Sequence, residues 1–247
     1  MLNRFSRTEL LLGEENMSKL AQSKIAIFGI GGVGSYVAEG LARCGIGEFI
    51  LIDSDDISLT NINRQIHALE TTIGQKKTLM MKERILAINP QAKVTTIEKL
   101  YTPESNFFNW DDNYTYIVDA VDDVKAKINL IVNANKYNLP IMSSMGTANK
   151  LDPQKFVITD IYKTHTCPLA RIMRKTLKQQ GIKKLKVLYS TEEPFTNYTV
   201  NFKENTSKDN SPASTRKQPL GSISFVPPIA GLMIAGEIVK DICQINR

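Results

Sequence analysis

Short apolar runs alternate with amphipathic segments through the first half of the chain. Apolar side chains are nearly continuous at residues 24–28, whereas they recur at helical spacing at residues 35–44. Continuous apolar runs are typical of strands buried on both faces of a parallel sheet, and helical spacing is typical of the covering helices. The predicted strands are residues 24–28, 48–53, about 92–98, 114–119 and 140–144, and the predicted helices are residues 35–44, about 75–88 and about 123–137. This alternation predicts a Rossmann-like, doubly wound, mostly parallel α/β sheet.

The second half of the chain has a different pattern. Residues 155–162 and 184–189 are predicted strands, and they flank a predicted helix at residues 168–180. Residues 197–218 are rich in Asn, Ser, Thr, Lys and Pro, which predicts a long flexible loop. We therefore expect a single domain, residues 1–247, in which the second half extends the sheet.

The last part of the sequence is apolar. A short strand is predicted at residues 222–225 and a closing helix at residues 228–243. The apolar run from Phe225 to Val239 contains two prolines near its start and one glutamate, and it is too short to span a bilayer. We expect a buried core helix that begins at the prolines.

A glycine-rich turn joins the first predicted strand to the first predicted helix. Its glycines are Gly29, Gly31, Gly32 and Gly34. Glycines let the backbone turn tightly and approach phosphates, and the helix N-terminus that follows offers free N–H groups and the positive end of a dipole. Asp53 ends the second strand, where an acid can bind ribose hydroxyls. The turn predicts a nucleotide site.

The segment after Asp53 contains side chains that a dehydrogenase does not need. Asn61, Arg64 and Lys77 follow in one connection and at the start of the next helix. Cations in such a cluster neutralise the charge on a pentavalent phosphorus. The cluster therefore favours an enzyme that attacks the α-phosphate of ATP.

Further charged groups lie before and after this cluster. Upstream, Arg7 belongs to an N-terminal arm that could reach the same region. Downstream, Asp122 and Asp123 follow the strand at residues 114–119, at the edge where open parallel sheets bind ligands. Asp often caps a helix. We expect Asp123 to be the cap and Lys127 to lie on the surface.

The motifs GIGGVG, DSDDISLTNINRQ, GQKK and VDAVDD occur in this order. Together they resemble the adenylating superfamily that contains ubiquitin-activating enzymes and the bacterial activators of sulfur-carrier proteins. The segments NRFSRTELLLGEE, NRQIHAL, KTHTCPLARIMRK and GSISFVPPIAGLMIAGEIVKD resemble, within it, the tRNA threonylcarbamoyladenosine dehydratase family. This resemblance covers nearly the whole chain. It implies ATP-dependent cyclisation of the modified adenosine at tRNA position 37, through an acyl-adenylate.

The resemblance also implies roles for individual residues. The first half, to about residue 150, would bind Mg²⁺·ATP, and the second half would bind the tRNA. Asp122 would hold the metal, and Arg7 would reach the phosphates across a homodimer interface. The residues implied in nucleotide binding are Gly29, Gly31, Gly32, Gly34, Asp53, Asp55, Asn61, Arg64, Gln65, Lys77 and Asp122. Arg64, Lys77, Arg7 and Asp122 would also be catalytic. A sulfur-transfer partner protein is left open.

The three cysteines are scattered, with no C-x-x-C pair, which argues against a disulfide scaffold and suits a reducing cytoplasm. Many relatives use a cysteine to take an acyl group, and Cys167 before a basic helix is the candidate nucleophile. We favour a structural interpretation of Cys167, because an intramolecular cyclisation needs no external nucleophile. For His67, proton transfer and a structural hydrogen bond stay open, and His165 is a further candidate.

Positive charge is concentrated in one segment. The whole chain carries a net charge of +6, but residues 163–191 contain eight basic residues and no acidic one, so the rest is slightly acidic. Arg171, Arg174, Lys175 and Lys178 fall on one helical face, and we expect Ile172 on the opposite, core-facing stripe. A solvated face is the ordinary explanation. The unpaired charge instead favours a polyanion. The family resemblance implies that this polyanion is tRNA and not DNA.

Two other functions stay open at this point. The chain could activate the C-terminal glycine of a ubiquitin-like sulfur-carrier protein with the same ATP residues, although that class more often has C-x-x-C zinc ligands. It could also be a regulator or redox module with an NAD site, which would leave the cationic cluster without a role. The N-terminus has no long apolar run of the kind that a signal peptide needs.

Overall fold

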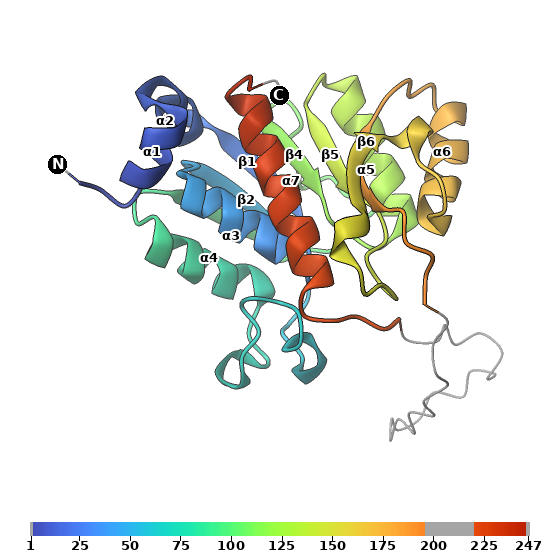
Figure 1. The fold of residues 1–247 in the computed structure, drawn as a ribbon, viewed down its shortest axis with the longest axis horizontal. Helices are drawn as coiled ribbons and strands as arrows, with labels where there is room; N and C mark the ends of the chain where they lie inside the picture. The colour runs from blue at the N-terminus through green and yellow to red at the C-terminus, as the bar shows by residue number, and fades with distance from the viewer. Residues whose placement is uncertain (1, 196–219, 246–247) are drawn as a thin grey trace.

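A computed structural model describes residues 2–195 and 220–245. These residues form a seven-stranded sheet with the order β3-β2-β1-β4-β5-β7-β6 (Figure 1). Six strands are parallel, and β6 alone runs antiparallel, next to β7. The strands are β1 Lys24–Phe28, β2 Glu48–Ile52, β3 Lys93–Ile97, β4 Tyr116–Asp119, β5 Ile141–Ser144, β6 Phe156–Asp160 and β7 Lys186–Ser190. The predicted α/β class is confirmed, including the extension of the sheet by the second half.

Helices cover both faces of the sheet. They are α1 Ser6–Leu12, α2 Glu14–Gln22, α3 Gly34–Cys44, α4 Lys77–Ile88, α5 Val124–Lys136, α6 Pro168–Gln179 and α7 Val226–Ile242. The 3₁₀ turns are η1 Leu59–Asn61, η2 Glu70–Thr72, η3 Pro153–Lys155 and η4 Ile161–Lys163. No helix in the described ranges has both the length and the apolar character needed to cross a membrane.

The core is divided by the sheet into two sides. On β1, Ile25 and Ile27 pack in the cluster under α3, α4 and α7, whereas Ala26 and Phe28 pack in the cluster under α5. Both sets are fully buried, which explains why the strand is a continuous apolar run. A third cluster joins α5 and α6 to β7.

Helices α3 and α7 cross at unusually close range (Figure 1). A Cβ atom on Gly40 would lie 2.8 Å from the Cβ of Ala235, and one on Gly231 would lie 2.5 Å from the carbonyl oxygen of Val33. Glycine at these two positions therefore permits the crossing. The predicted C-terminal helix is confirmed, and its prolines stand in its first turn.

The connection from β3 to β4 is aromatic and contains no helix, although residues 98–115 are all described. Phe108 and Trp110 pack on Phe28 at the end of β1, with ring centroids 4.9 and 6.2 Å from it. The connection carries the chain across the sheet, so the strand order reverses between β1 and β4. Ligands of open α/β sheets bind at the carboxyl ends of strands at such a reversal.

One prediction near the C-terminal end of the chain is wrong, because residues 222–225 contain no strand and residues 224–225 form a turn. The N-terminal arm, for which no element was predicted, contains two helices, α1 and α2. Residues 197–218, predicted as a flexible loop, lie outside the described residues.

Candidate nucleotide site

The glycine turn lies between β1 and α3, at the reversal of strand order. Gly29 has φ +87°, and a Cβ there would be 2.6 Å from the carbonyl oxygen of Ala120. A Cβ on Gly34 would be only 1.8 Å from the carbonyl oxygen of Gly29, whereas the nearest atom to one on Gly31 is Nε2 of Gln65 at 3.9 Å. Gly29 and Gly34 therefore shape the turn, and the open side at Gly31 leaves room for a phosphate beside the N-terminus of α3.

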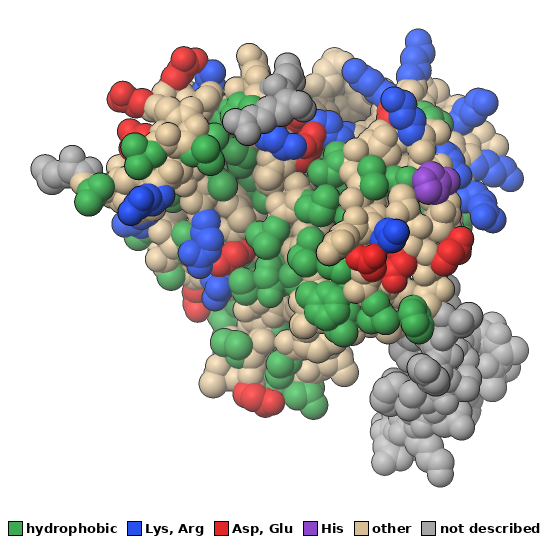
Figure 2. Space-filling view, in the orientation of Figure 1, with side chains coloured by type: hydrophobic (Ala, Val, Ile, Leu, Met, Phe, Trp, Pro, Cys, Tyr) green, Lys and Arg blue, Asp and Glu red, His purple; other side chains and the backbone are tan. Residues whose placement is uncertain are grey.

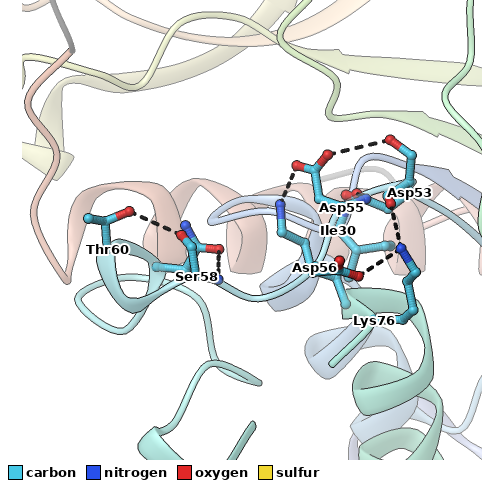
Figure 3. A network of polar contacts seen from close by, with 10 residues as sticks. Ile30, Asp53, Asp55, Asp56, Ser58, Thr60 and Lys76 are labelled. Carbon is cyan, nitrogen blue, oxygen red and sulfur yellow. Dashed lines mark hydrogen bonds and ion pairs between the residues drawn. The ribbon is translucent and has the colours of Figure 1, made fainter. Parts of the chain in front are cut away.

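Asp53 ties the glycine turn to the end of β2 (Figure 3). Its Oδ2 accepts a hydrogen bond from the amide of Ile30 at 2.7 Å, and its Oδ1 accepts one from the amide of Asp55 at 2.9 Å. The structure therefore places Asp53 beside the glycine turn, as the sequence predicts. Its contact with a ribose stays a prediction.

Two lysines at the start of α4 pair with the acids after β2, and Figure 3 shows one of them, Lys76, beside Asp56. Lys77, which is buried, has its Nζ 2.6 Å from Oδ2 of Asp55, and Lys76 lies 2.7 Å from Asp56. The side chain of Asp55 is 63% exposed. Asp55, predicted to bind nucleotide, is here the counterion that keeps Lys77 at the site.

The connection after β2 brings three predicted residues to the glycine turn. Asn61 accepts a hydrogen bond from the amide of Ser58 at 3.1 Å and so closes η1. Arg64 lies over the turn, because its Cγ is 3.3 Å from the position of a Cβ on Gly32. Its Nη1 donates to the carbonyl of Thr60 and to Oδ1 of Asn63, at 2.9 and 2.8 Å. These acceptors are neutral, so the guanidinium keeps its charge and most of its donors for an anion.

Gln65 and His67 are buried beside this cluster with unused hydrogen-bonding atoms. Oε1 of Gln65 and both ring nitrogens of His67 have no partner among the described residues. Burial, followed by the charges of Lys77 and Arg84, lowers the pKa of His67 to about 4. The imidazole is therefore neutral and a weak proton acceptor at neutral pH, which makes it a poor candidate for proton transfer.

Asp122 is exposed after β4 and has no hydrogen bond to any described residue. The predicted cap at Asp123 is confirmed, because its Oδ1 accepts from the amide of Ala126 at 2.8 Å. The prediction that Lys127 lies on the surface is wrong. Lys127 is fully buried, and its Nζ is 3.0 Å from Oδ1 of Asp119.

Sequence reasoning missed Asp119 and Lys127, although a signal was present. The buried positions of α5 include Ala126, Lys127, Leu130 and Ile131, so Lys127 falls inside the apolar stripe of the helix. A lysine on a core-facing stripe requires an internal anion. Asp119, at the end of the buried strand β4, is the nearest candidate in the sequence.

Arg7 does not join the other site residues within one chain. It is exposed on α1, which packs at the opposite, amino edge of the sheet (Figure 1). There Arg4 donates to the carbonyl oxygen of Ile88 at 2.9 Å, and Phe5 lies beside Gly45. A contact of Arg7 with the nucleotide would have to come from another subunit.

Basic side chains gather over α6 (Figure 2). Arg171, Lys175 and Lys178 are exposed, as predicted. Arg174 differs, because it is half-buried and its Nη1 donates to the carbonyl oxygen and the hydroxyl of Thr164. The placement of Ile172 in the core is also wrong, since this side chain is 52% exposed.

Cys167 immediately precedes α6 and is 3% exposed. It packs in an apolar cluster with Met145 and Met173. The neighbouring His165 is exposed, and its Nδ1 lies 2.8 Å from the hydroxyl of Thr166. This burial supports the structural interpretation of Cys167.

The fold and the site define a nucleotide-binding α/β protein, with cations and carboxylates around a glycine turn at the carboxyl edge of the sheet. The chain belongs to the ThiF family, whose model matches residues 5–247. The predicted membership of the adenylating superfamily is thereby confirmed.

Two relatives and one solved structure are informative. The tRNA threonylcarbamoyladenosine dehydratase of Bacillus subtilis is 43% identical over 99% of this chain and 96% of that protein. The enzyme of the same name from Escherichia coli is 42% identical over 71% of this chain and 65% of that protein. The crystal structure of the E. coli enzyme TcdA in complex with ATP superposes with a TM-score of 0.83 at 32% identity, covering 98% of this chain and 94% of that one.

Proposed function

We propose that this protein catalyses the ATP-dependent dehydration of N6-threonylcarbamoyladenosine at position 37 of tRNA. The proposal is carried by the likeness to the B. subtilis dehydratase, which extends over 96% of that protein. The ATP complex of the similar E. coli enzyme and the glycine turn of this chain support ATP as the cofactor.

The reaction has two steps. An oxygen of the threonyl carboxylate attacks the α-phosphorus of ATP, a new P–O bond forms, and pyrophosphate leaves. A nearby atom of the carbamoyl group then attacks the activated carbonyl, the ring closes, and AMP leaves with the former carboxylate oxygen. The tRNA loses one water in total. Because the second nucleophile is already part of the substrate, the enzyme contributes position and charge.

The site residues would oppose the charge that grows on the phosphates. Helix α3 begins at Gly34, within the glycine turn, and no side chain of its N-cap residue accepts from its first amides, so its positive dipole end would favour a phosphate there. Arg64 has donors free for an anion, and Lys77 can exchange the exposed carboxylate of Asp55 for a phosphate oxygen. These groups stabilise the pentavalent transition state.

Asp122 would hold Mg²⁺. Its carboxylate makes no hydrogen bond to a described residue, and carboxylate oxygen is a preferred ligand of this metal. The described residues contain no cluster of three or more His, Cys, Asp or Glu side chains fit for a metal. Nucleotide-bound Mg²⁺ does not require such a cluster, since phosphates and water supply most of its ligands. When bound, the metal neutralises phosphate charge.

Arg7 would act as part of a homodimer. Beside it on α1, Leu10 and Leu11 are 82% and 78% exposed, which suits a subunit interface. Mixing chains with Arg7→Ala and chains with Asp122→Asn tests this arrangement. If Arg7 of the partner subunit serves each site, one site of the mixed dimer has both residues and activity returns. Continued inactivity of the mixture would contradict it. A sulfur-transfer partner stays a prediction.

The exposed basic residues of α6 would bind the tRNA backbone. Changing Arg171, Lys175 and Lys178 to Gln should weaken tRNA binding and reduce the slope of log affinity against log salt by about 0.7–0.9 for each phosphate that is no longer neutralised. ATP affinity should not change. A variant with Gln at the exposed Lys93, Lys99 and Lys136 has the same net charge and is the control. Equal salt slopes for both variants would leave α6 as a solvated surface.

The activity itself is tested by mass spectrometry of tRNA nucleosides after incubation with protein and ATP. The threonylcarbamoyl nucleoside should lose the mass of one water, and pyrophosphate release should require modified tRNA. Release that depends instead on a ubiquitin-like carrier protein would support the alternative function.

A further inference from the structure

Lys127 and Asp119 form an ion pair that is sealed inside the protein. Their atoms Nζ and Oδ1 are 3.0 Å apart, and neither side chain has any exposed surface. Removing two charges from water is costly, and apolar side chains of similar size often fill such a space equally well. The pair therefore needs an explanation other than packing.

The remaining bonds of the pair go to the connection that follows β4. Nζ of Lys127 donates to the carbonyl oxygen of Val121 at 3.0 Å, and Oδ1 of Asp119 accepts from the amide of Val121 at 3.3 Å. The hydroxyl of Ser143, on β5, donates to the other carboxylate oxygen of Asp119. Both backbone polar groups of Val121 are thus held by buried side chains.

The backbone is therefore held in place on both sides of Asp122. Val121, which precedes it, is bonded to the buried pair, and Asp123, which follows it, caps α5. Two residues before Asp122, the carbonyl of Ala120 packs against Gly29 so closely that a Cβ there would clash at 2.6 Å. The backbone of the connection is tied to the core and to the glycine turn, while the carboxylate of Asp122 stays exposed.

We propose that Lys127, Asp119 and Ser143 are positioning residues that hold the carboxylate of Asp122 where it meets the metal of Mg²⁺·ATP. The inference rests on the proposed function, which assigns Asp122 to the metal. Lys127 has a second effect: it neutralises Asp119, the other acid at the end of β4. Groups that orient a metal ligand in this way commonly change metal affinity when they are removed.

The test removes the pair without leaving a lone buried charge. The double variant Lys127→Met/Asp119→Asn keeps the approximate size of both side chains, and Lys125→Met, an exposed lysine on the same helix, is the control. ATP affinity is measured in EDTA and in Mg²⁺, together with the melting temperature. We expect unchanged affinity in EDTA and a gain from Mg²⁺ that is at least about 10-fold smaller than in the wild type. The control should keep the full gain.

A folded double variant with the wild-type gain from Mg²⁺ would overturn the proposal. If the double variant does not fold, Ser143→Ala decides, because it removes one bond to Asp119 without burying a charge. It should reduce the gain from Mg²⁺ by about threefold, and an unchanged gain would overturn the proposal. The variant Asp122→Asn distinguishes failure of the metal assignment from failure of the positioning role. If Asp122→Asn keeps the gain in ATP affinity from Mg²⁺, the assignment of Asp122 to the metal fails. If it loses the gain while the folded double variant keeps it, only the positioning role fails.

Discussion

The amino and carboxyl edges of the sheet differ in how far their charged side chains are paired with opposite charges. At the amino edge, Lys186 lies 2.9 Å from Glu237 and 2.7 Å from Asp241, and the hydroxyl of Tyr116 donates to Asp241 at 2.8 Å. At the carboxyl edge, Arg64 contacts only neutral oxygens, and Asp122 has no partner among the described residues.

The difference separates charges that serve the fold from charges that await a ligand. Where opposite charges are paired within the chain, as at Lys186, few hydrogen-bonding groups remain to bind another molecule. Around the glycine turn, Lys77 is paired with the exposed Asp55. The cation of Arg64, the acid of Asp122 and the buried amide oxygen of Gln65 lack such partners among the described residues. Unpaired polar groups of this kind are costly in the free protein, and a bound ATP molecule would offset that cost. Substitutions at the two edges should therefore have opposite effects on activity and on stability.

The largest effect should come from the carboxyl edge. On the proposed function, Arg64→Ala removes a cation that would oppose charge on the α-phosphate, and turnover should fall by roughly 10²- to 10³-fold with the melting temperature nearly unchanged. Asp122→Asn should be at least as damaging. Steady-state pyrophosphate release measures both variants, with Arg43→Ala, an ion-paired surface arginine on α3, as the control. Near-normal turnover of Arg64→Ala would contradict the inference that unpaired charges at the carboxyl edge serve the nucleotide.

His67, at the carboxyl edge, should make the stability of the protein depend on pH. Burial, then Lys77 and Arg84, lowers its pKa to about 4 in the fold, against 6.5 in the free side chain. As pH falls below 6.5 the unfolded chain takes up the proton first, so stability is lost between pH 6.5 and about 4. This group accounts for about 3 kcal/mol of that loss.

Denaturant unfolding at several pH values measures the effect. The free energy of unfolding of His67→Gln should fall less steeply than that of the wild type over this window. The exposed His165 is the matched control, and His165→Gln should follow the wild type. Parallel curves for His67→Gln and wild type would show that His67 is not held neutral.

Lys186→Met should have the reverse profile of Arg64→Ala. It removes the cation that Glu237 and Asp241 share and leaves only Lys240 paired with Glu237, and the free energy of unfolding should fall by about 2 kcal/mol. Turnover should stay near that of the wild type, because the amino edge is remote from the glycine turn. Lys184→Met, at an exposed neighbouring position, should change neither quantity. A stable but inactive Lys186→Met protein would contradict the division between the edges.

Local sequence patterns predicted most of the nucleotide half. Strand β1 was located to the residue, and the glycine turn, Asp53 and the cap at Asp123 follow from the preferences of a few neighbouring residues. Such features depend on backbone geometry and on contacts within one or two turns, which a single sequence contains.

The features missed from the sequence are side-chain contacts between one element and the element or turn that precedes it. Lys127 was assigned to the surface because its counterion Asp119 precedes the helix and becomes a neighbour only when β4 packs on α5. The hydrogen bond from Arg174 to Thr164, in a turn before the helix, was likewise not foreseen, whereas a contact of Arg174 with tRNA stays a prediction. The charge pattern of a helix does not distinguish a free cation from a paired one, so Arg174 was grouped with the exposed basic residues of α6.

Cys167 belongs to neither edge, and its replacement should have the smallest effect. Its thiol is buried in an apolar cluster, so Cys167→Ala should retain most activity, and Cys167→Ser should lose about 1 kcal/mol of stability for placing a hydroxyl there. Turnover, thermal unfolding and a search for an enzyme-bound thioester by mass spectrometry of the intact protein measure this. If Cys167→Ala folds and binds ATP but is inactive, and the wild type yields a thioester, the acyl group passes through the protein. The cyclisation would then need an external nucleophile, and activation of a carrier protein would become the better account of the site.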